Sequence, residues 1–216
     1  LRADPNDPDL MFWVSVVSLS SGQTDFARQI LERLILIDPL FSTSHLLIGY
    51  TDFFEGRLDD AINPIRKAYE LGNEIQVTMW CLVRLLTAKG EVDEAIDIAD
   101  QLLIRHPESP FAHMAKALIL AFRGEHKEAL SHLTPDVREW ASNDLEWSQA
   151  LSECYALAGK YDDAMDLLEK AVDNGFLNHK FLAFHNPFLI SLRGSERFEK
   201  LMERVKRELS EFEATL

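Results

Sequence analysis

Paired acidic residues are the side chains of this sequence that come nearest to a catalytic pattern. Asp59-Asp60, Asp93-Glu94 and Asp162-Asp163 are adjacent carboxylates, the residue type that general acid and base catalysis uses. However, each pair stands at the same distance after a glycine that recurs along the chain. A pair repeated in this way indicates the start of a helix, where carboxylates are stabilised by the positive end of the helix dipole. We therefore predict no catalytic residue and no enzyme.

The cysteines and histidines do not form a nucleophilic or metal-binding pattern. Cys81 and Cys154 each lie in an apolar helical pattern, without the basic neighbours that activate a thiol. His126 and His132 are six residues apart, which does not place two ligands on one helical face. The glycines occur singly, so no glycine-rich phosphate loop is formed. We predict no metal and no cofactor.

Composition and charge restrict the possible partners. The chain has 216 residues, of which 47% are hydrophobic and 27% charged, as in a folded soluble protein. Its formal charge of −14 repels phosphate backbones and anionic lipid headgroups, so we expect no nucleic-acid and no membrane partner. Two cysteines favour a reducing, cytoplasmic location. A periplasmic location stays open, because Leu1 is not a natural start.

A ladder of glycines organises the elements that carry these residues. The spacings are 34, 34, 34 and 35 residues, between Gly22, Gly56, Gly90, Gly124 and Gly159. An alanine follows each glycine by five residues, at Ala27, Ala61, Ala95, Ala129 and Ala164. The period predicts one helical hairpin per repeat, with the glycine in the turn and the alanine where two helices pack closely. Pro64 and Pro135 should kink the second helices of two repeats, with Thr134 capping a restarted helix.

These features resemble the tetratricopeptide-repeat (TPR) family over residues 8–178. The resemblance implies an all-α fold, a right-handed α-solenoid of about five hairpins. The expected repeats are 8–41, 42–75, 76–109, 110–144 and 145–178. Residues 1–7 are interpreted as the tail of a truncated preceding repeat, because Pro5 is in register with Pro39. Residues 179–216 are interpreted as a degenerate repeat whose last helix caps the array.

The C-terminal stretch also resembles the segment that closes repeat arrays in bacterial multidomain regulators. The similarity rests on Pro187, Leu192-Arg193, Arg197-Phe198 and Leu201. Such regulators include repeat-bearing serine/threonine kinases, class III nucleotide cyclases and winged-helix transcription regulators. The resemblance implies a regulatory or recruiting module of a larger signalling or transcription-regulatory protein.

In the family, the first helices of successive repeats line a concave groove that binds a protein or peptide. The corresponding positions here are mostly apolar or aromatic: Phe12, Val16, Leu46, Tyr50, Phe53, Trp80, Arg84, Met114 and Leu118. We expect an apolar or helical partner segment in this groove, with Arg84 fixing its polarity. Acidic chaperone tails are disfavoured, because Arg84 alone cannot form the family's carboxylate clamp. Alternatively, tight curvature lets the first helices cover one another, and the same side chains form a core.

Self-association is the alternative function. Leu10, Val14 and Val17 share one face of the first predicted helix, which would contact a preceding helix in a longer array. An uncovered apolar face of this kind is typical of an interaction surface. We therefore expect a homo-oligomer that forms through the N-terminal end if this face is not otherwise covered.

Overall fold

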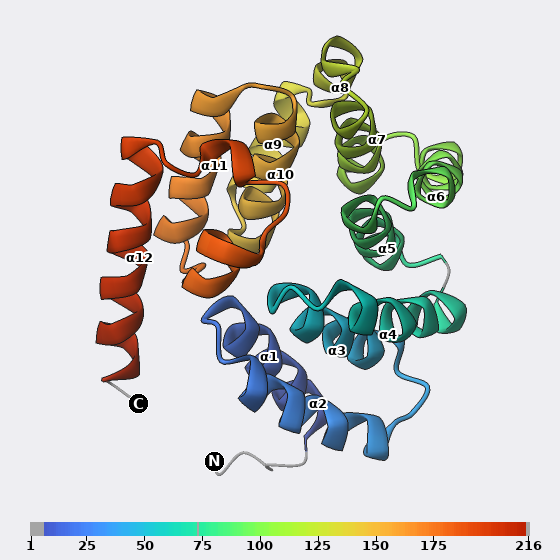
Figure 1. Cartoon of the computed structure of the whole chain (residues 1–216). Coiled ribbons are helices and arrows are strands. Elements are labelled where there is room, and N and C mark those ends of the chain that lie inside the picture. Colours follow the sequence, from blue (N-terminus) through green and yellow to red (C-terminus); the bar gives the residue numbers. More distant parts are fainter. Residues whose placement is uncertain (1–6, 73, 215–216) are drawn as a thin grey trace.

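The computed structural model describes residues 7–72 and 74–214. Pro5, which suggested a truncated repeat, lies outside these ranges. The described chain consists of helices and turns without strands, so the expected all-α class is confirmed (Figure 1). In order, the helices are α1 (Pro8–Ser20), α2 (Thr24–Ile37), α3 (Ser42–Phe54), α4 (Leu58–Leu71), α5 (Gln76–Lys89), α6 (Val92–Arg105), α7 (Pro110–Phe122), α8 (His126–His132), α9 (Pro135–Ser142), α10 (Leu145–Leu157), α11 (Tyr161–Asp173), η1 (Phe181–His185), η2 (Ile190–Leu192) and α12 (Glu196–Glu213).

The ladder glycines form the turns inside the hairpins. All five have φ between +74° and +83°, a conformation that glycine adopts without a steric penalty. The five ladder alanines are fully buried, as the close-packing interpretation requires. A small residue is also needed where α3 packs on α4, because a Cβ added to Gly49 would lie 2.4 Å from Cγ1 of Ile65. The predicted role of the glycine and alanine ladder is therefore confirmed.

The two helices of a hairpin differ in how they are buried. In α6 the buried residues are Ala95, Ile98, Ala99 and Leu102, which form one stripe of an amphipathic helix. In α5 every residue from Thr78 to Thr87 is buried, so this helix is surrounded on all sides. First helices pack on one another as well as on their own hairpin partners, since α5 contacts both α3 and α7. The first helices thus form the inside of a curved array (Figure 1).

The two interrupting prolines have different effects. Helix α8 ends at His132 and α9 begins at Pro135, with the Thr134 side chain accepting a hydrogen bond from the backbone N–H of Val137. The predicted restart is therefore confirmed. At Pro64, by contrast, α4 continues as one helix. Pro64 removes the hydrogen bond to the carbonyl of Asp60, and because Asp60 is exposed, water can satisfy that carbonyl.

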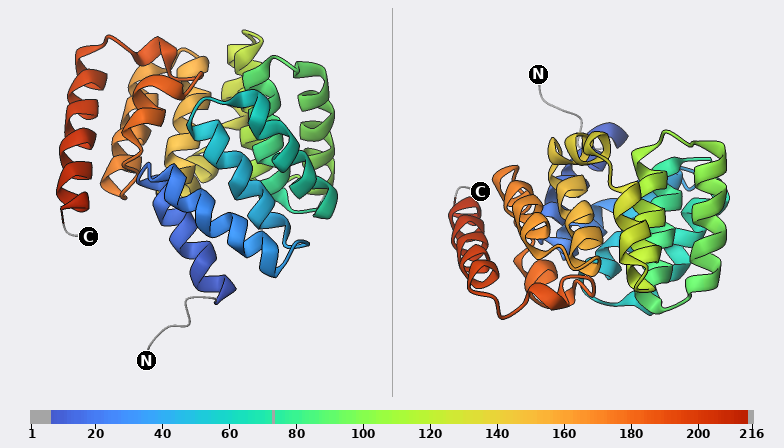
Figure 2. Two further views of the ribbon diagram at one scale, coloured as in Figure 1. Left: turned by 60° about the horizontal axis from the view of Figure 1, so that its bottom comes forward. Right: turned by 90° about the horizontal axis from the view of Figure 1, so that it is seen from above.

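The array bends until its two ends meet. Residues 176–189, which we name the closing segment, run back past the C-terminal ends of the first helices (Figures 1 and 2). The backbone N–H of Leu177 donates to the carbonyl of Ser20 at 2.8 Å. The Phe181 ring lies against Phe54, with the ring centroids 4.5 Å apart. The fifth hairpin and the closing segment are thereby joined to the first two hairpins.

The last helix, α12, lies outside this ring and packs on α11 (Figure 2). Its stripe of Phe198, Leu201, Met202 and Val205 is buried. Arg197 forms ion pairs with Glu169 and Asp166, both at 2.7 Å. The helix therefore covers the apolar face of α11 and presents its charged face to water.

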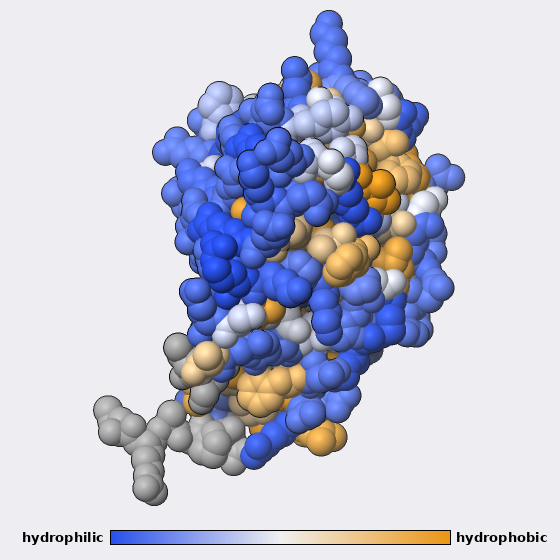
Figure 3. Space-filling model, turned by 60° about the vertical axis from the view of Figure 1, so that its left-hand side comes forward, coloured by the Kyte–Doolittle hydropathy of each residue, from blue (hydrophilic) through white to orange (hydrophobic). Residues whose placement is uncertain are grey.

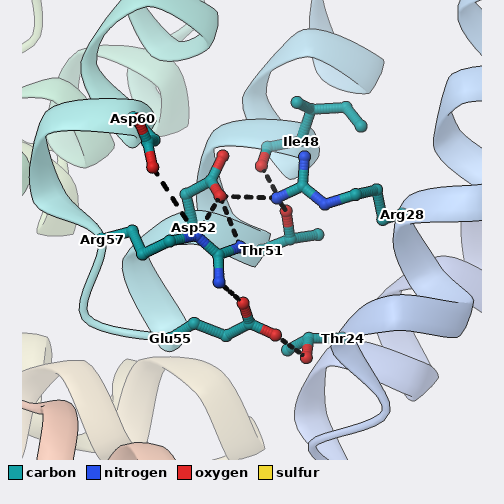
Figure 4. A network of polar contacts seen from close by, with 8 residues as sticks. All are labelled: Thr24, Arg28, Ile48, Thr51, Asp52, Glu55, Arg57 and Asp60. Atoms are coloured by element: carbon teal, nitrogen blue, oxygen red, sulfur yellow. Dashed lines mark hydrogen bonds and ion pairs between the residues drawn. The ribbon is translucent and has the colours of Figure 1, made fainter.

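A polar network joins the first two hairpins (Figure 4). Arg28 on α2 contacts the Asp52 carboxylate on α3 at 2.6 Å, and Arg57 contacts the same carboxylate at 2.6 Å. Thr24 donates a hydrogen bond to Glu55, which also pairs with Arg57. The Asp52 carboxylate is buried, whereas the two arginines are partly exposed. By binding both arginines, this carboxylate fixes the angle between the two hairpins.

Candidate functional site

Most of the predicted groove residues are part of the core. Two of the nine, Phe12 and Val16, are half-buried. The other seven are buried: Leu46, Tyr50, Phe53, Trp80, Arg84, Met114 and Leu118. The prediction of a groove that is open along the whole inner surface is therefore wrong, because these seven side chains are buried. The physical reason is the tight curvature, which brings the first helices together and lets them cover one another.

Arg84, expected to face a partner, is instead held inside the array. Its guanidinium pairs with the Glu153 carboxylate on α10, donating from Nε to Oε2 at 2.8 Å. It also donates to Gln149 at 3.0 Å and to the Tyr50 hydroxyl at 3.3 Å. Burial alone would lower the pKa of Arg84, but Glu153 and Tyr50 outweigh this effect and the pKa is raised. Arg84 is thus a permanently charged core residue.

The closing segment covers this charged pair. Asn186 donates from Nδ2 to Oε1 of Glu153 at 2.6 Å. The ring of Phe181 lies beneath the guanidinium of Arg84, 5.7 Å from Cζ to the ring centroid. The sequence carried a partial signal for this contact, since Glu153 and Gln149 are polar at inner positions of the fifth repeat. No pattern in the sequence pointed to Asn186 as their cover.

One part of the inner surface stays open, at the N-terminal ends of the first helices. A cavity of about 400 Å³ lies there between α1, α3, α5, α7 and the start of α10, and we name it the entrance pocket. Four of the predicted groove residues line it: Phe12, Val16, Leu46 and Tyr50. The predicted site is therefore reduced to one mouth of the array, because the closing segment lies at the opposite ends of these helices.

Aromatic side chains form two walls of the entrance pocket. Phe12 and Trp13 of α1 make one edge-to-face pair, with centroids 5.0 Å apart. Phe111 of α7 and Trp147 of α10 make another at 4.9 Å, and Trp140 stacks on Trp147 from behind. Trp13 and Trp147 were not among the predicted groove residues. Trp13 directly follows the expected residue Phe12, and Trp147 stands two residues before Gln149, the corresponding position of the fifth repeat; both line the same cavity.

Two carboxylates stand at the rim of the entrance pocket. Asp144 caps α10 by accepting from the N–H groups of Glu146 and Trp147. Among the described residues, no hydrogen bond or ion pair joins the Glu146 carboxylate to another side chain. Burial raises the pKa of Glu146 to about 7; Arg84 lowers it and Asp144 raises it. The pocket therefore combines apolar walls with one carboxylate that lacks a direct partner.

The residues predicted for self-association lie on the outer face of α1. Leu10 and Val17 are exposed, and Val14 is half-buried. Together with Phe26 they line two shallow hollows, one of about 320 Å³ that includes Val14 and Val17. Apolar surface gathers at this lower end of the molecule (Figure 3). The structure thus places the three residues on one accessible apolar surface.

The histidines, cysteines and carboxylates of the described part of the chain do not form a metal cluster, and its thiols are buried. Within residues 7–72 and 74–214, no three His, Cys, Asp or Glu residues are grouped so that they could hold a metal ion. Cys81 and Cys154 are free and buried, and burial raises the pKa of Cys81 to about 12. None of the helices in the described ranges combines the length and apolar character of a membrane span.

Five hairpins with positive-φ glycine turns and buried alanines define a helical-repeat scaffold of the tetratricopeptide type. A family model described as "Psidin, N-terminal TPR repeats region" matches residues 86–193, half of the chain. The chain belongs to this family of TPR proteins. Such proteins are generally scaffolds for protein–protein interaction.

Curated and solved relatives agree with this assignment. A TPR repeat-containing protein from Methanocaldococcus jannaschii is 32% identical over 79 residues, 37% of this chain and 23% of the relative. The match thus spans about a quarter of that relative's length. The crystal structure of TTC0263, a TPR protein of Thermus thermophilus, aligns with a TM-score of 0.60 at 17% identity, covering 85% of this chain and all of that one. A TPR protein from Parabacteroides merdae aligns with a TM-score of 0.57 at 17% identity, covering 97% and 84%. At these identities the structures show the fold alone.

Proposed function

We propose that the chain is a protein-interaction scaffold that binds an apolar partner segment in the entrance pocket. The observation that carries this proposal is the aromatic cavity at one mouth of an array whose inside is otherwise filled. Binding along the whole inner surface would require removal of the closing segment and exposure of the buried Arg84–Glu153 pair. The second step alone is costly, because breaking a buried ion pair lowers the stability of the fold by about 3–5 kcal/mol.

The lining of the pocket suits an apolar segment that inserts one or two side chains. Phe12, Val16, Phe111 and Trp147 are half-buried, so each has apolar surface left to cover. Aromatic side chains in concave sites supply a large share of binding free energy in protein interfaces. Helix α5 is surrounded on all sides and most of α3 is buried, so this part of the site is preorganised and little ordering entropy opposes binding.

The proposal is tested by selecting peptides from a displayed random library against the intact chain. Affinities of the selected peptides are then measured for Trp13→Ala and for Phe26→Ala. Both side chains are exposed and border the hollow on α1, but of the two only Trp13 lines the entrance pocket. We expect Trp13→Ala to weaken binding by about tenfold or more, as for an interface anchor, and Phe26→Ala to leave it unchanged.

The opposite pattern, with Phe26→Ala alone reducing the affinity, would move the binding site to the outer face of α1. A library without any selectable binder would contradict the proposal as a whole. Chemical shifts of the Trp147 indole N–H upon titration give an independent location for the bound peptide.

Self-association is a second candidate, favoured by the accessible apolar surface of Leu10, Val14 and Val17. We infer that two copies would cover this surface through their α1 helices, which would remove the exposed side chain of Val17 from water. Light scattering should then show a mass that rises with concentration, and Val17→Glu should restore the monomer. A strictly monomeric wild-type mass at high concentration contradicts this candidate.

The biological setting that we propose is a regulatory or recruiting module of a larger signalling or transcription-regulatory protein. The similarity of the C-terminal stretch to the ends of repeat arrays in bacterial regulators supports it. A cytoplasmic location accompanies the proposal, since both cysteines are free and buried. The coding sequence upstream of Leu1 provides the test: a kinase, cyclase or DNA-binding domain would support this setting, and further repeats alone would favour a free-standing adaptor.

A further inference from the structure

We propose that the partner segment places a basic side chain, lysine or arginine, in the entrance pocket, where it pairs with the carboxylate of Glu146. This inference rests on the proposed function and specifies the chemistry of the partner. The site would thus select a cationic residue with apolar neighbours.

The charges that line the pocket have one sign. Among the described residues, its titratable side chains are Asp144 and Glu146 of the α10 start, Tyr50 of α3 and Cys81 of α5, and none of the lining residues is Lys, Arg or His. Asp144 already accepts two backbone hydrogen bonds as a helix cap. Glu146 makes no such bond with its side chain. Both bonds reach Oδ1 of the exposed Asp144, and Glu146 is the half-buried carboxylate of the pocket that accepts no hydrogen bond among the described residues.

The half-buried Glu146 lines the entrance pocket together with Tyr50 and Cys81. Burial is the main cause of the raised pKa values of Tyr50 and Cys81, and the negative charge of Glu146 raises both further. Tyr50 and Cys81 lie on the inner helices α3 and α5, so the pocket brings Glu146 of α10 to the same cavity as these helices. The nearest buried cation, Arg84, already donates to Glu153, Gln149 and Tyr50. Arg84 therefore attracts Glu146 only at longer range.

The aromatic walls suit the rest of a basic side chain. A lysine or arginine carries an apolar stem that packs against apolar surface while its charged head reaches a polar group. The faces of Trp and Phe rings also attract cations. The pairs Phe12–Trp13 and Phe111–Trp147 flank the pocket, so a cation bound to Glu146 would lie between aromatic side chains.

The position of Glu146 in its helix offers a simpler role for this residue. Glu146 stands in the first turn of α10, where any carboxylate stabilises the helix dipole. That role is served equally well by an exposed side chain, as Asp59, Asp93 and Asp162 show in the first turns of α4, α6 and α11. The helix dipole therefore explains the acidic residue but not its half-buried place in the lining of the entrance pocket.

The test uses two blocked pentapeptides of apolar residues, one with a central lysine and the other with a central norleucine. Norleucine keeps the apolar stem and lacks the ammonium group. Binding to the intact chain is measured calorimetrically at pH 8 and low salt. We expect the lysine peptide to bind about tenfold more tightly or better, as for a desolvated cation between aromatic rings and a carboxylate.

Two variants complete the experiment. Glu146→Gln should abolish the preference for lysine, while Glu139→Gln, an exposed carboxylate on the neighbouring α9, should retain it. Equal binding of both peptides to the wild type would overturn the cationic partner and leave the apolar pocket in place. Tighter binding of a peptide with central glutamate would also overturn it. Absence of binding by either peptide at millimolar concentration would remove both this inference and the pocket as the binding site.

Discussion

The side-chain amide of Asn178 donates a hydrogen bond to the backbone carbonyl of Leu19, 3.0 Å away and 159 residues earlier in the chain. Its Oδ1 atom accepts from the N–H of Phe181 at 3.1 Å. The same oxygen lies against the ladder glycine that ends the first helix, 3.2 Å from the position of an added Cβ on Gly22. One buried asparagine thus joins the first repeat to the closing segment and completes the ring.

Replacement of Asn178 by alanine should lower the free energy of unfolding. The change leaves the buried Phe181 N–H without its partner, which costs ~1–3 kcal/mol. It also removes one of two hydrogen bonds of the Leu19 carbonyl, which still accepts from the N–H of Gly22. Asn143→Ala is the control, because the Asn143 side chain also bonds one backbone carbonyl but is exposed. Urea denaturation measures both. An equal, small effect of the two substitutions would contradict the structural role of Asn178.

Substitutions of Trp80 should separate its core role from a partner-binding role. Trp80 is fully buried, so Trp80→Ala should destabilise the fold by ~3–5 kcal/mol through the cavity that it leaves. Trp80→Phe should cost less, because the indole Nε1 has no hydrogen-bond partner among the described residues. Thermal unfolding gives both values. A stable Trp80→Ala variant that had lost only peptide affinity would restore the groove interpretation at this position.

The stability of the chain should fall with rising pH through the titration of Glu146. Because the folded pKa is raised to about 7, the folded state holds this proton more tightly than the unfolded state does. Its stabilising contribution is complete below pH ~4.5, the usual value of a glutamate, and is lost as the pH rises through about 7. The charges that act on this carboxyl are those of Arg84, which lowers its pKa, and Asp144, which raises it; Tyr50 and Cys81 line the same pocket.

Glu146→Gln should therefore stabilise the chain more at pH 8 than at pH 5, by ~1–3 kcal/mol relative to the wild type. Denaturation at the two pH values measures this difference. Glu139→Gln gives the background effect of losing one surface charge. A difference that did not depend on pH would show that Glu146 is well solvated and would contradict the burial of its carboxylate.

The alanine ladder allows a direct test of helix packing. Ala95 is fully buried between α6 and its neighbours, so Ala95→Leu adds three carbon atoms where the helices already touch. Overpacking of this kind should destabilise the fold by ~1–3 kcal/mol. Ile104→Leu on the exposed side of α6 is a suitable control. A neutral Ala95→Leu variant would mean that the hairpins can separate without cost.

The sequence by itself determined the repeat architecture. Each ladder glycine is required by the turn of its own hairpin, and each ladder alanine is required by the contact between adjacent helices. Such short-range requirements recur at a fixed period, so they can be found in a single sequence. The break before Pro135 and the cap at Thr134 were predictable for the same reason, because both depend on backbone hydrogen bonds within a few residues.

Only the tertiary structure decided which inner residues are open. The seven buried groove residues have the same types and spacing that an open groove would have, and their burial depends on the curvature summed over five repeats. Small angles between neighbouring hairpins accumulate, so contacts such as Arg84 with Glu153 and Asn178 with Leu19 join segments distant in sequence. No local pattern encodes that sum. The accumulated bend lets the closing segment cover the C-terminal ends of the first helices and leaves the entrance pocket around Glu146 open at their N-terminal ends.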